Sequence, residues 1–372
     1  MISKLKPKSE FSRNVLTLMT GTTISQALPI AVAPILTRIY SPEDFGLFAF
    51  YFAIVSILAV LATGRYELAI ALPKKHKIDV SKVNIDFTIE RFEEDFYMAT
   101  ESQLPDLKEK YPYFFPPQIT DSVSLAKIYN KDEQELFAET QKIYKDFTEY
   151  KLQLTNLFKH IKYYKPKFRA PKVITMLTNI DYASRVIYAD SLLIVSLDVY
   201  LGKNHPFYKD YPKYIKENNS KEHLIIDVAT EIVKKQIPPS NNRSFVNKMI
   251  FEGKKMYLLD AYLPLVSDKE KIGFAEDKLA WAKANEEQIW SYFVEKNLLF
   301  STDTKLNSRF LDVAPFSKFY MEQDNLSPGR IGVWVGWQIV RSYMQHNDVS
   351  LQELINTNEL DLYKKSKYKP KR

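Results

Sequence analysis

The residues with the clearest chemical spacing lie in the middle of the chain. Residues 230–234 are Thr-Glu-Ile-Val-Lys, which have the spacing of the zinc-binding motif His-Glu-x-x-His. In that motif two imidazoles one helical turn apart hold the zinc ion, and the glutamate activates a water molecule. Thr230 and Lys234 stand at the imidazole positions and Glu231 at the position of the general base. Further along, Glu252 stands where a second helix would supply a carboxylate ligand.

The residue types at these positions argue against metal chemistry. A lysine ammonium repels a metal cation and has no lone pair to donate. We therefore predict that the protein has no catalytic residues and binds no zinc, so that Thr230, Glu231, Lys234 and Glu252 are at most the remains of a metal site. An ordinary amphipathic helix without such ancestry is an equal alternative.

The rest of the chain offers little further chemistry. There is no cysteine, which excludes disulfides, thiolate metal ligands and a cysteine nucleophile. No two histidines are three or four residues apart, so a helical metal site would need distant partners; they are His76, His160, His205, His223 and His346. No glycine-rich phosphate loop is present, and we predict no cofactor.

A second notable pattern lies near the C-terminus and suggests a loop that enters a helix. Its residues are Ser327, Pro328, Gly329, Arg330, Gly332, Trp334, Gly336, Trp337 and Arg341. Ser327 or Asp324 would cap the helix, proline would occupy its first turn, and the later glycines would allow close helix packing. The arginines would neutralise buried carboxylates such as Glu252 or Glu287, or would hold an acidic group of a partner.

Hydrophobic periodicity predicts the elements that position these residues. Alternating residues indicate strands over 83–89, 172–177 and 191–197. Helical patterns cover 91–97, 131–163, 222–236, 245–263, 276–295, 331–345 and 351–356. A small early sheet followed by helices is typical of an α+β fold, mostly helical, which would be zincin-like if the metal-site ancestry holds. The basic tail, residues 364–372, is expected to be solvated.

The first 77 residues differ from the rest. Two uncharged apolar segments, about 15–36 and 45–63, are each long enough to cross a hydrocarbon core of about 30 Å, so we predict a transmembrane hairpin that anchors the chain in the inner membrane. A signal peptide would have a shorter apolar region. Lysines and arginines flank the pair, which places both ends, and residues 78–372, in the cytoplasm. Because the positive charge lies mainly here, no nucleic-acid partner is expected.

This N-terminal region also resembles the start of oligosaccharide flippases. The resemblance lies in Phe-Ser-Arg-Asn-Val at 11–15, Gly-Thr-Thr-Ile-Ser-Gln at 21–26, and the stretches 34–46 and 64–73. Such flippases have a dozen or more spans around a central cavity. Two spans cannot enclose such a path, so transport by this chain is not expected.

Residues from about 80 to the end resemble the gliding-motility lipoprotein family GldB. The resemblance lies in residues 84–97, 239–245, 252–260, 285–290, 314–319 and 324–344. It implies a role in surface gliding, with other gliding-motility envelope proteins as partners and a lipid-anchored, periplasm-facing location. The chain departs from the family pattern because it has no cysteine for lipidation.

These observations give one leading functional hypothesis and two alternatives. The leading one is a non-catalytic, GldB-like gliding-motility accessory domain, residues 78–372, which acts through protein contacts at the cell envelope and follows a flippase-like hairpin, residues 1–77. The first alternative is a metal-dependent hydrolase of degenerate zincin type. The second is a non-functional flippase fragment in a chimeric chain.

Overall fold

The computed structural model describes residues 78–240 and 242–371. The chain divides into two units after Ile78, and the described residues belong almost entirely to the second, Asp79–Arg372. They form a mostly helical domain with one four-stranded sheet, so the predicted α+β class is confirmed. The predicted transmembrane segments 15–36 and 45–63 lie outside the described residues.

The sheet consists of short strands in the order β1-β2-β4-β3. The strands are β1 Ile89–Arg91, β2 Lys172–Met176, β3 Val186–Ala189 and β4 Leu192–Ser196. β1, β2 and β4 are parallel to one another, whereas β3 is antiparallel to β4 and forms an edge. Val173, Ile174 and Leu193 are fully buried, because the central strands β2 and β4 carry the core of the sheet.

Two of the three predicted strands are confirmed to within one residue, and the third was mostly wrong. Within 83–89 only Ile89 belongs to a strand, although Ile85 and Phe87 pack against the core as the alternation required. No strand was predicted where β3 lies. This strand was missed because it is only four residues long and turns back into β4 directly at Asp190, which has a positive φ.

The helices of the first half pack near β1 and β2. They are α4 Phe92–Tyr97, α5 Leu104–Lys110, α6 Asp121–Ile128, α7 Lys131–Tyr144 and α8 Thr148–Tyr164. The single helix predicted over 131–163 is therefore two. The chain breaks at residues 145–147, where the Asp146 side chain accepts a hydrogen bond from the Thr148 amide and opens the second helix.

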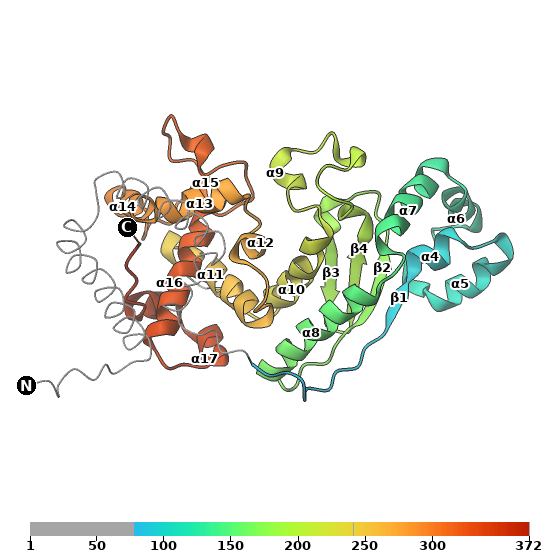
Figure 1. Cartoon of the computed structure of the whole chain (residues 1–372), viewed down its shortest axis with the longest axis horizontal. Helices are drawn as coiled ribbons and strands as arrows, with labels where there is room; N and C mark the ends of the chain where they lie inside the picture. Colours follow the sequence, from blue (N-terminus) through green and yellow to red (C-terminus); the bar gives the residue numbers. More distant parts are fainter. Residues whose placement is uncertain (1–77, 241, 372) are drawn as a thin grey trace, which may run out of the picture. The chain divides into compact units, whose positions relative to one another are not determined.

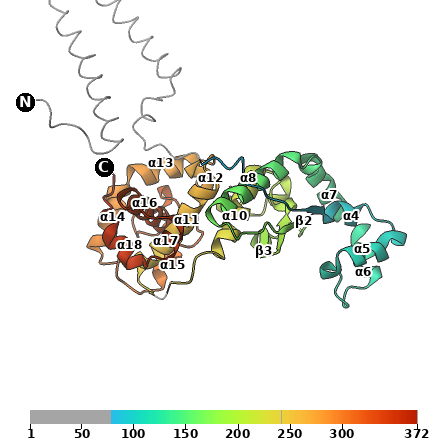
Figure 2. The same ribbon diagram turned by 90° about the horizontal axis from the view of Figure 1, so that it is seen from below.

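The second half is helical throughout. Its helices are α9 Lys213–Lys216, α10 Leu224–Lys234, α11 Phe245–Tyr262, α12 Asp268–Ile272, α13 Glu276–Ala284, α14 Glu286–Glu295, α15 Lys305–Phe310, α16 Ile331–His346, α17 Leu351–Asn356 and α18 Glu359–Lys365. The helix predicted over 276–295 is broken at Asn285, whose side chain donates to the Trp281 carbonyl. Figures 1 and 2 show α8 and α10 beside the sheet, with α4–α7 on one side of it and α11–α18 on the other.

Helices α11 and α16 form the closest contact in this half. A Cβ atom on Gly336 would lie 1.8 Å from the Met249 carbonyl oxygen, and one on Gly253 would lie 2.3 Å from the Gly336 carbonyl carbon. Only glycine allows the two backbones to approach this closely. The crossing therefore fixes α11 against the C-terminal motif.

The basic tail lies against the domain through Ser366 and Tyr368, while its lysines at 364, 365, 367, 369 and 371 are exposed, as predicted for solvated charges. Lys364 and Lys365 close α18, and the Ser366 carbonyl accepts a hydrogen bond from Ser342. The Tyr368 hydroxyl donates to Glu286 over 2.9 Å. Glu286 is correspondingly buried. In the described part of the chain, no helix combines the length and the apolar character needed to cross a membrane.

Candidate functional site

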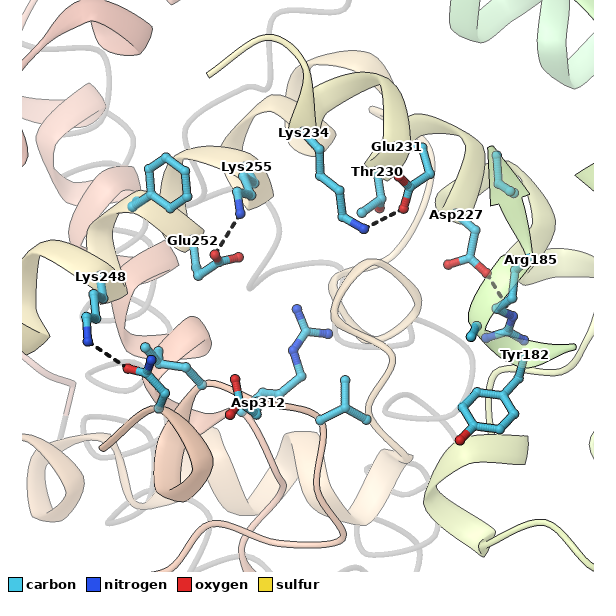
Figure 3. Close-up of a pocket in the computed structure, with 17 residues that line it drawn as sticks. Tyr182, Arg185, Asp227, Thr230, Glu231, Lys234, Lys248, Glu252, Lys255 and Asp312 are labelled. Atoms are coloured by element: carbon cyan, nitrogen blue, oxygen red, sulfur yellow. Dashed lines mark hydrogen bonds and ion pairs between the residues drawn. The ribbon is translucent and has the colours of Figure 1, made fainter. Parts of the chain in front are cut away.

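A cavity of about 740 Å³ lies between α10 and α11. The loop before β3, the loop after α15 and the start of α16 complete its walls. The lining residues are Tyr182, Ala183, Arg185, Val186, Asp227, Thr230, Glu231, Lys234, Lys248, Phe251, Glu252, Lys255, Asn307, Leu311, Asp312, Val313 and Arg330. The structure thus brings all four residues of the suspected metal-site pattern to one cavity (Figure 3).

The α10 wall carries the first three of these residues. Lys234 forms an ion pair with Glu231 at 2.5 Å, drawn as a dashed line in Figure 3. The Thr230 hydroxyl donates to the Ile226 carbonyl over 2.7 Å, within its own helix. At the two imidazole positions the structure therefore has the Lys234 ammonium, which is ion-paired, and the Thr230 hydroxyl, which donates its proton to a backbone carbonyl.

The α11 wall places Glu252 among lysines. Glu252 pairs with Lys255 at 2.7 Å, and Lys248 donates to the Asn307 side chain over 2.9 Å. Figure 3 shows these side chains facing the same space as Lys234 and Glu231. Lys248 is thus bonded to a neutral amide, and its charge is not matched by a carboxylate at that position.

Asp227 and Arg185 form the wall near β3. The Asp227 carboxylate accepts a hydrogen bond from the Tyr200 hydroxyl at 2.8 Å and lies 3.4 Å from both Arg185 and His223. Burial opposes ionisation of Asp227, but these neighbours outweigh it and lower the pKa of its carboxyl group. The carboxylate is therefore held charged at the edge of the cavity.

The sequence analysis did not single out Asp227, Arg185, Lys248 or Lys255. The spacing of the polar residues on the two helices could have predicted those that lie on α10 and α11. Residues 227, 230, 231 and 234 of α10, and 248, 252 and 255 of α11, follow the spacing of a single helical face. Such polar stripes on two consecutive, otherwise apolar helices indicate faces that meet water or a ligand. Arg185 has no such periodic signal.

Arg330 enters the cavity from the start of α16. It is the residue before the first helical turn and has φ 61° and ψ 27°, the left-handed region. Within the described residues, its guanidinium makes no hydrogen bond and no ion pair within 4 Å. Burial lowers the pKa of Arg330, and the more distant charges of Glu252 and Asp227 offset this only in part.

Arg341, the other arginine of the C-terminal motif, is fully engaged. It forms paired hydrogen bonds to Asp260 at 2.8 and 2.9 Å and to Asp268 at 2.7 and 2.8 Å. Its guanidinium lies 3.8 Å from the Trp337 ring centre, and the Trp337 indole donates to Asp260. Arg341 thus neutralises carboxylates of the domain, as predicted, but they are Asp260 on α11 and Asp268 on α12 rather than the suggested Glu252 or Glu287.

The remaining motif residues hold the loop that precedes α16. The buried Ser327 hydroxyl accepts the Ser317 amide and donates to the Asp324 carbonyl, and the Pro328 carbonyl accepts the Ser317 hydroxyl. A Cβ atom on Gly329 would lie 2.1 Å from the Ala314 carbonyl oxygen. The predicted cap was wrong, since the Ser317 hydroxyl accepts the first helical amide, that of Ile331.

Gly332 and Trp334 complete the motif and are both buried. Gly332 faces Phe310 and Leu311 of the α15 region, where a Cβ atom would come within 3.0 Å of each. The Trp334 ring stacks edge-on with Trp337. These two residues therefore contribute to packing rather than to the cavity.

The donor set at the cavity does not fit a zinc ion. Over residues 78–240 and 242–371, no group of three His, Cys, Asp or Glu side chains is placed to hold a metal. Of the four positions in the pattern, only the two glutamates offer a ligand, and each is paired with a lysine. A cationic ammonium at this place raises the free energy of a bound dication.

The fold and site therefore define an α+β domain with a charged cavity between two helices. Comparison with protein families matches residues 73–370 to the family described as gliding motility protein GldB, and the chain belongs to this family. Residues 11–79 match the family described as polysaccharide biosynthesis protein. Both resemblances seen in the sequence are thereby confirmed. No curated protein and no solved structure matches the chain.

Proposed function

We propose that the chain is a non-catalytic gliding-motility protein that acts through contacts with other proteins of the cell envelope. Membership of the GldB family supports the gliding role, and both family matches point to the envelope. The observation that carries the non-catalytic part is the Lys234–Glu231 ion pair. It places a cation and its counter-ion where a hydrolase of this pattern would need a metal ligand and a free general base.

A metal-dependent hydrolase is the second candidate, and one observation favours its ancestry. Thr230, Glu231, Lys234 and Glu252 were chosen from spacing alone, and all four line one cavity. This is what a former metal site would leave behind. The same residues supply too few ligands for present metal chemistry, so the ancestry and the activity are separate proposals.

Metal analysis of the purified full chain tests the non-catalytic proposal. After dialysis against a chelator and then against buffer containing zinc, we expect no stoichiometric zinc and no peptide hydrolysis. One equivalent of zinc that survives dialysis, and that is lost in Glu252→Ala, would overturn the proposal.

A matched gain-of-ligand variant tests the ancestry. In Thr230→His/Lys234→His the two imidazoles would lie one turn apart on α10 and face the cavity that Glu252 lines. We expect this variant to bind zinc, and the same variant with Glu252→Ala to bind it at least tenfold more weakly. Equal zinc binding with and without Glu252 would show that α10 and α11 do not share a former metal site.

The side of the membrane is a further part of the proposal. The charges that flank residues 15–36 and 45–63 favour a cytoplasmic location for residues 78–372, whereas the family resemblance implies a periplasm-facing one. We expect a C-terminal reporter that is active only in the periplasm to stay silent and a cytoplasmic reporter to be active. The opposite result would mean that one of the two apolar segments does not span the membrane.

A further inference from the structure

Among the described residues, two charged side chains of the cavity lining, the exposed Asp312 and the partly buried Arg330, form no hydrogen bond or ion pair. The lining has five cationic side chains, Arg185, Lys234, Lys248, Lys255 and Arg330, and four carboxylates, Asp227, Glu231, Glu252 and Asp312. Three of the cations form ion pairs with three of the carboxylates. Lys248 is bonded to Asn307, and the Arg330 guanidinium makes no hydrogen bond or ion pair with any described residue.

The backbone at Arg330 has a left-handed conformation, which is unfavourable for a residue with a side chain and which glycine would adopt freely. Gly329 directly precedes it, and its own lack of a side chain is required by the Ala314 carbonyl. Residue 330 therefore combines an unfavourable backbone conformation with a partly buried guanidinium at the cavity.

We propose that Arg330 is the counter-ion for a carboxylate carried by a segment of a partner polypeptide that binds in the cavity between α10 and α11. This inference rests on the proposed function, because it specifies the protein contact. A carboxylate fits the two-pronged donor geometry of a guanidinium.

The charge balance favours a single carboxylate over a phosphate. With five cations and four carboxylates, the lining has one positive charge in excess. A monoanion cancels this excess. A phosphate with nearly two negative charges would leave a negative excess and would be repelled by Glu252 and Asp227, the two carboxylates whose charges reach Arg330.

Three features favour a polypeptide as the source of the carboxylate. The volume of about 740 Å³ lies within the range for binding pockets and exceeds what one small anion needs. Phe251, Leu311 and Val313 add apolar surface to the charged walls. Val186, at the start of the edge strand β3, also lines the cavity, and an edge strand has backbone donors and acceptors free for an extended chain.

Fluorescence anisotropy on the purified full chain tests this inference. The probe is the fluorescein-labelled peptide Gly-Ala-Glu-Ala-Gly with an amidated C-terminus, compared with the same peptide carrying Gln in place of Glu. We expect the Glu peptide to bind at least tenfold more tightly. Equal binding of the two peptides would overturn the proposal.

The variant Arg330→Gly removes the guanidinium and also releases the backbone strain, so it is expected to fold with an unchanged or higher melting temperature. It should bind the Glu peptide as weakly as the Gln peptide. Lys367→Gly is the matched control, because Lys367 is an exposed cation with φ 52° outside the cavity, and it should bind like the parent. Undiminished binding by Arg330→Gly would contradict the assignment; should that variant not fold, Arg330→Gln replaces it.

Competition distinguishes the possible sources of the anion. Unlabelled Glu peptide should displace the probe at lower concentration than sodium acetate or inorganic phosphate. If acetate competes as well as the peptide, the site binds small carboxylates and the polypeptide part is wrong. If phosphate competes better, the carboxylate part is wrong.

Mass spectrometry of the peptide after binding, together with a gliding assay, distinguishes a failure of this inference from a failure of the proposed function. If the peptide binds but mass spectrometry shows it cleaved, the non-catalytic function fails and the binding site stands. If it does not bind while the chain restores gliding to a bacterium lacking its own family member, only the further inference fails.

Discussion

Both faces of helix α11 carry charged side chains, but those on one face are buried in ion pairs and those on the other face line the cavity. On one face, Lys254 is buried and pairs with Glu359 at 2.8 Å, and Asp260 accepts hydrogen bonds from Arg341 and Trp337. On the other face, Lys248, Glu252 and Lys255 line an accessible cavity. On the first face the charged groups Lys254 and Asp260 both have partners of opposite charge. On the second face the charge of Lys248 is matched by no carboxylate.

The same contrast separates the two arginines of the C-terminal motif. The Arg341 guanidinium makes four hydrogen bonds to two aspartates, whereas the Arg330 guanidinium makes none to the described residues. One sequence motif therefore contains both a structural arginine, Arg341, and an arginine of the cavity, Arg330. The two are distinguished by whether the guanidinium has partners within the domain, and not by their place in the motif.

The largest effect is expected at the helix crossing that supports the paired face. Gly336→Ala would place a Cβ atom 1.8 Å from the Met249 carbonyl oxygen, and neither backbone can move without displacing its whole helix. We expect a loss of about 3 kcal/mol or more in the free energy of unfolding, measured with urea. Gly332→Ala is the control, because part of its contact is with the flexible Leu311 side chain, and it should cost clearly less.

Adjacent lysines on α11 allow a direct test of the two faces. Lys254→Met leaves Glu359 charged and buried without its partner, so we expect a loss of about 3–5 kcal/mol in unfolding free energy. Lys255→Met breaks only the Glu252 pair at the cavity, where water can solvate the carboxylate, and should cost about 1 kcal/mol or less. Similar losses for both variants would remove the distinction between the faces.

The two arginines provide the next comparison. Arg341→Gln removes the charge that holds Asp260 and Asp268 together, and we expect a loss of about 2 kcal/mol, measured by chemical denaturation. Arg330→Gln should change the unfolding free energy by no more than about 0.5 kcal/mol. A loss at Arg330 as large as that at Arg341 would indicate a structural role for both.

The smallest effect concerns pH at the cavity wall. Because the folded-state pKa of Asp227 is lowered, its carboxylate adds stability that is present above its unfolded pKa, about 3.9, and is lost as pH falls through the lower folded value. The difference in stability between the parent and Asp227→Asn should therefore shrink as pH falls from 5 to 3, where the carboxylate becomes protonated. Urea midpoints measured across this range would test it, and a difference that grew on acidification would contradict the assignment.

The sequence predicted the features that depend on local spacing. The helix at 351–356 and the strands β2 and β4 follow from periodicity, and the convergence of Thr230 and Lys234 with Glu252 follows from placing two patterned segments on adjacent helices. Short breaks such as those at residues 145–147 and Asn285 were missed because the apolar pattern continues across them.

Long-range pairings could not be obtained in this way. The partners of Arg341 are 81 and 73 residues away, and Tyr368 meets Glu286 across 82 residues. Many carboxylates were available to each of these groups, and only the fold selects among them. The wrong partners for Arg341 and the missed contact between Tyr368 and Glu286 have this common physical cause.

The contact between Gly253 and Gly336 also determines how the cavity can change its width. Where backbone meets backbone, two helices cannot slide or rotate past each other without a collision, so α11 and α16 should behave as one rigid body. Lys248 and Glu252 on α11 then keep a fixed spacing from Arg330 at the start of α16. We therefore expect any change in the width of the cavity to come from movement of α10 and of β3, against which it packs, rather than from sliding between α11 and α16.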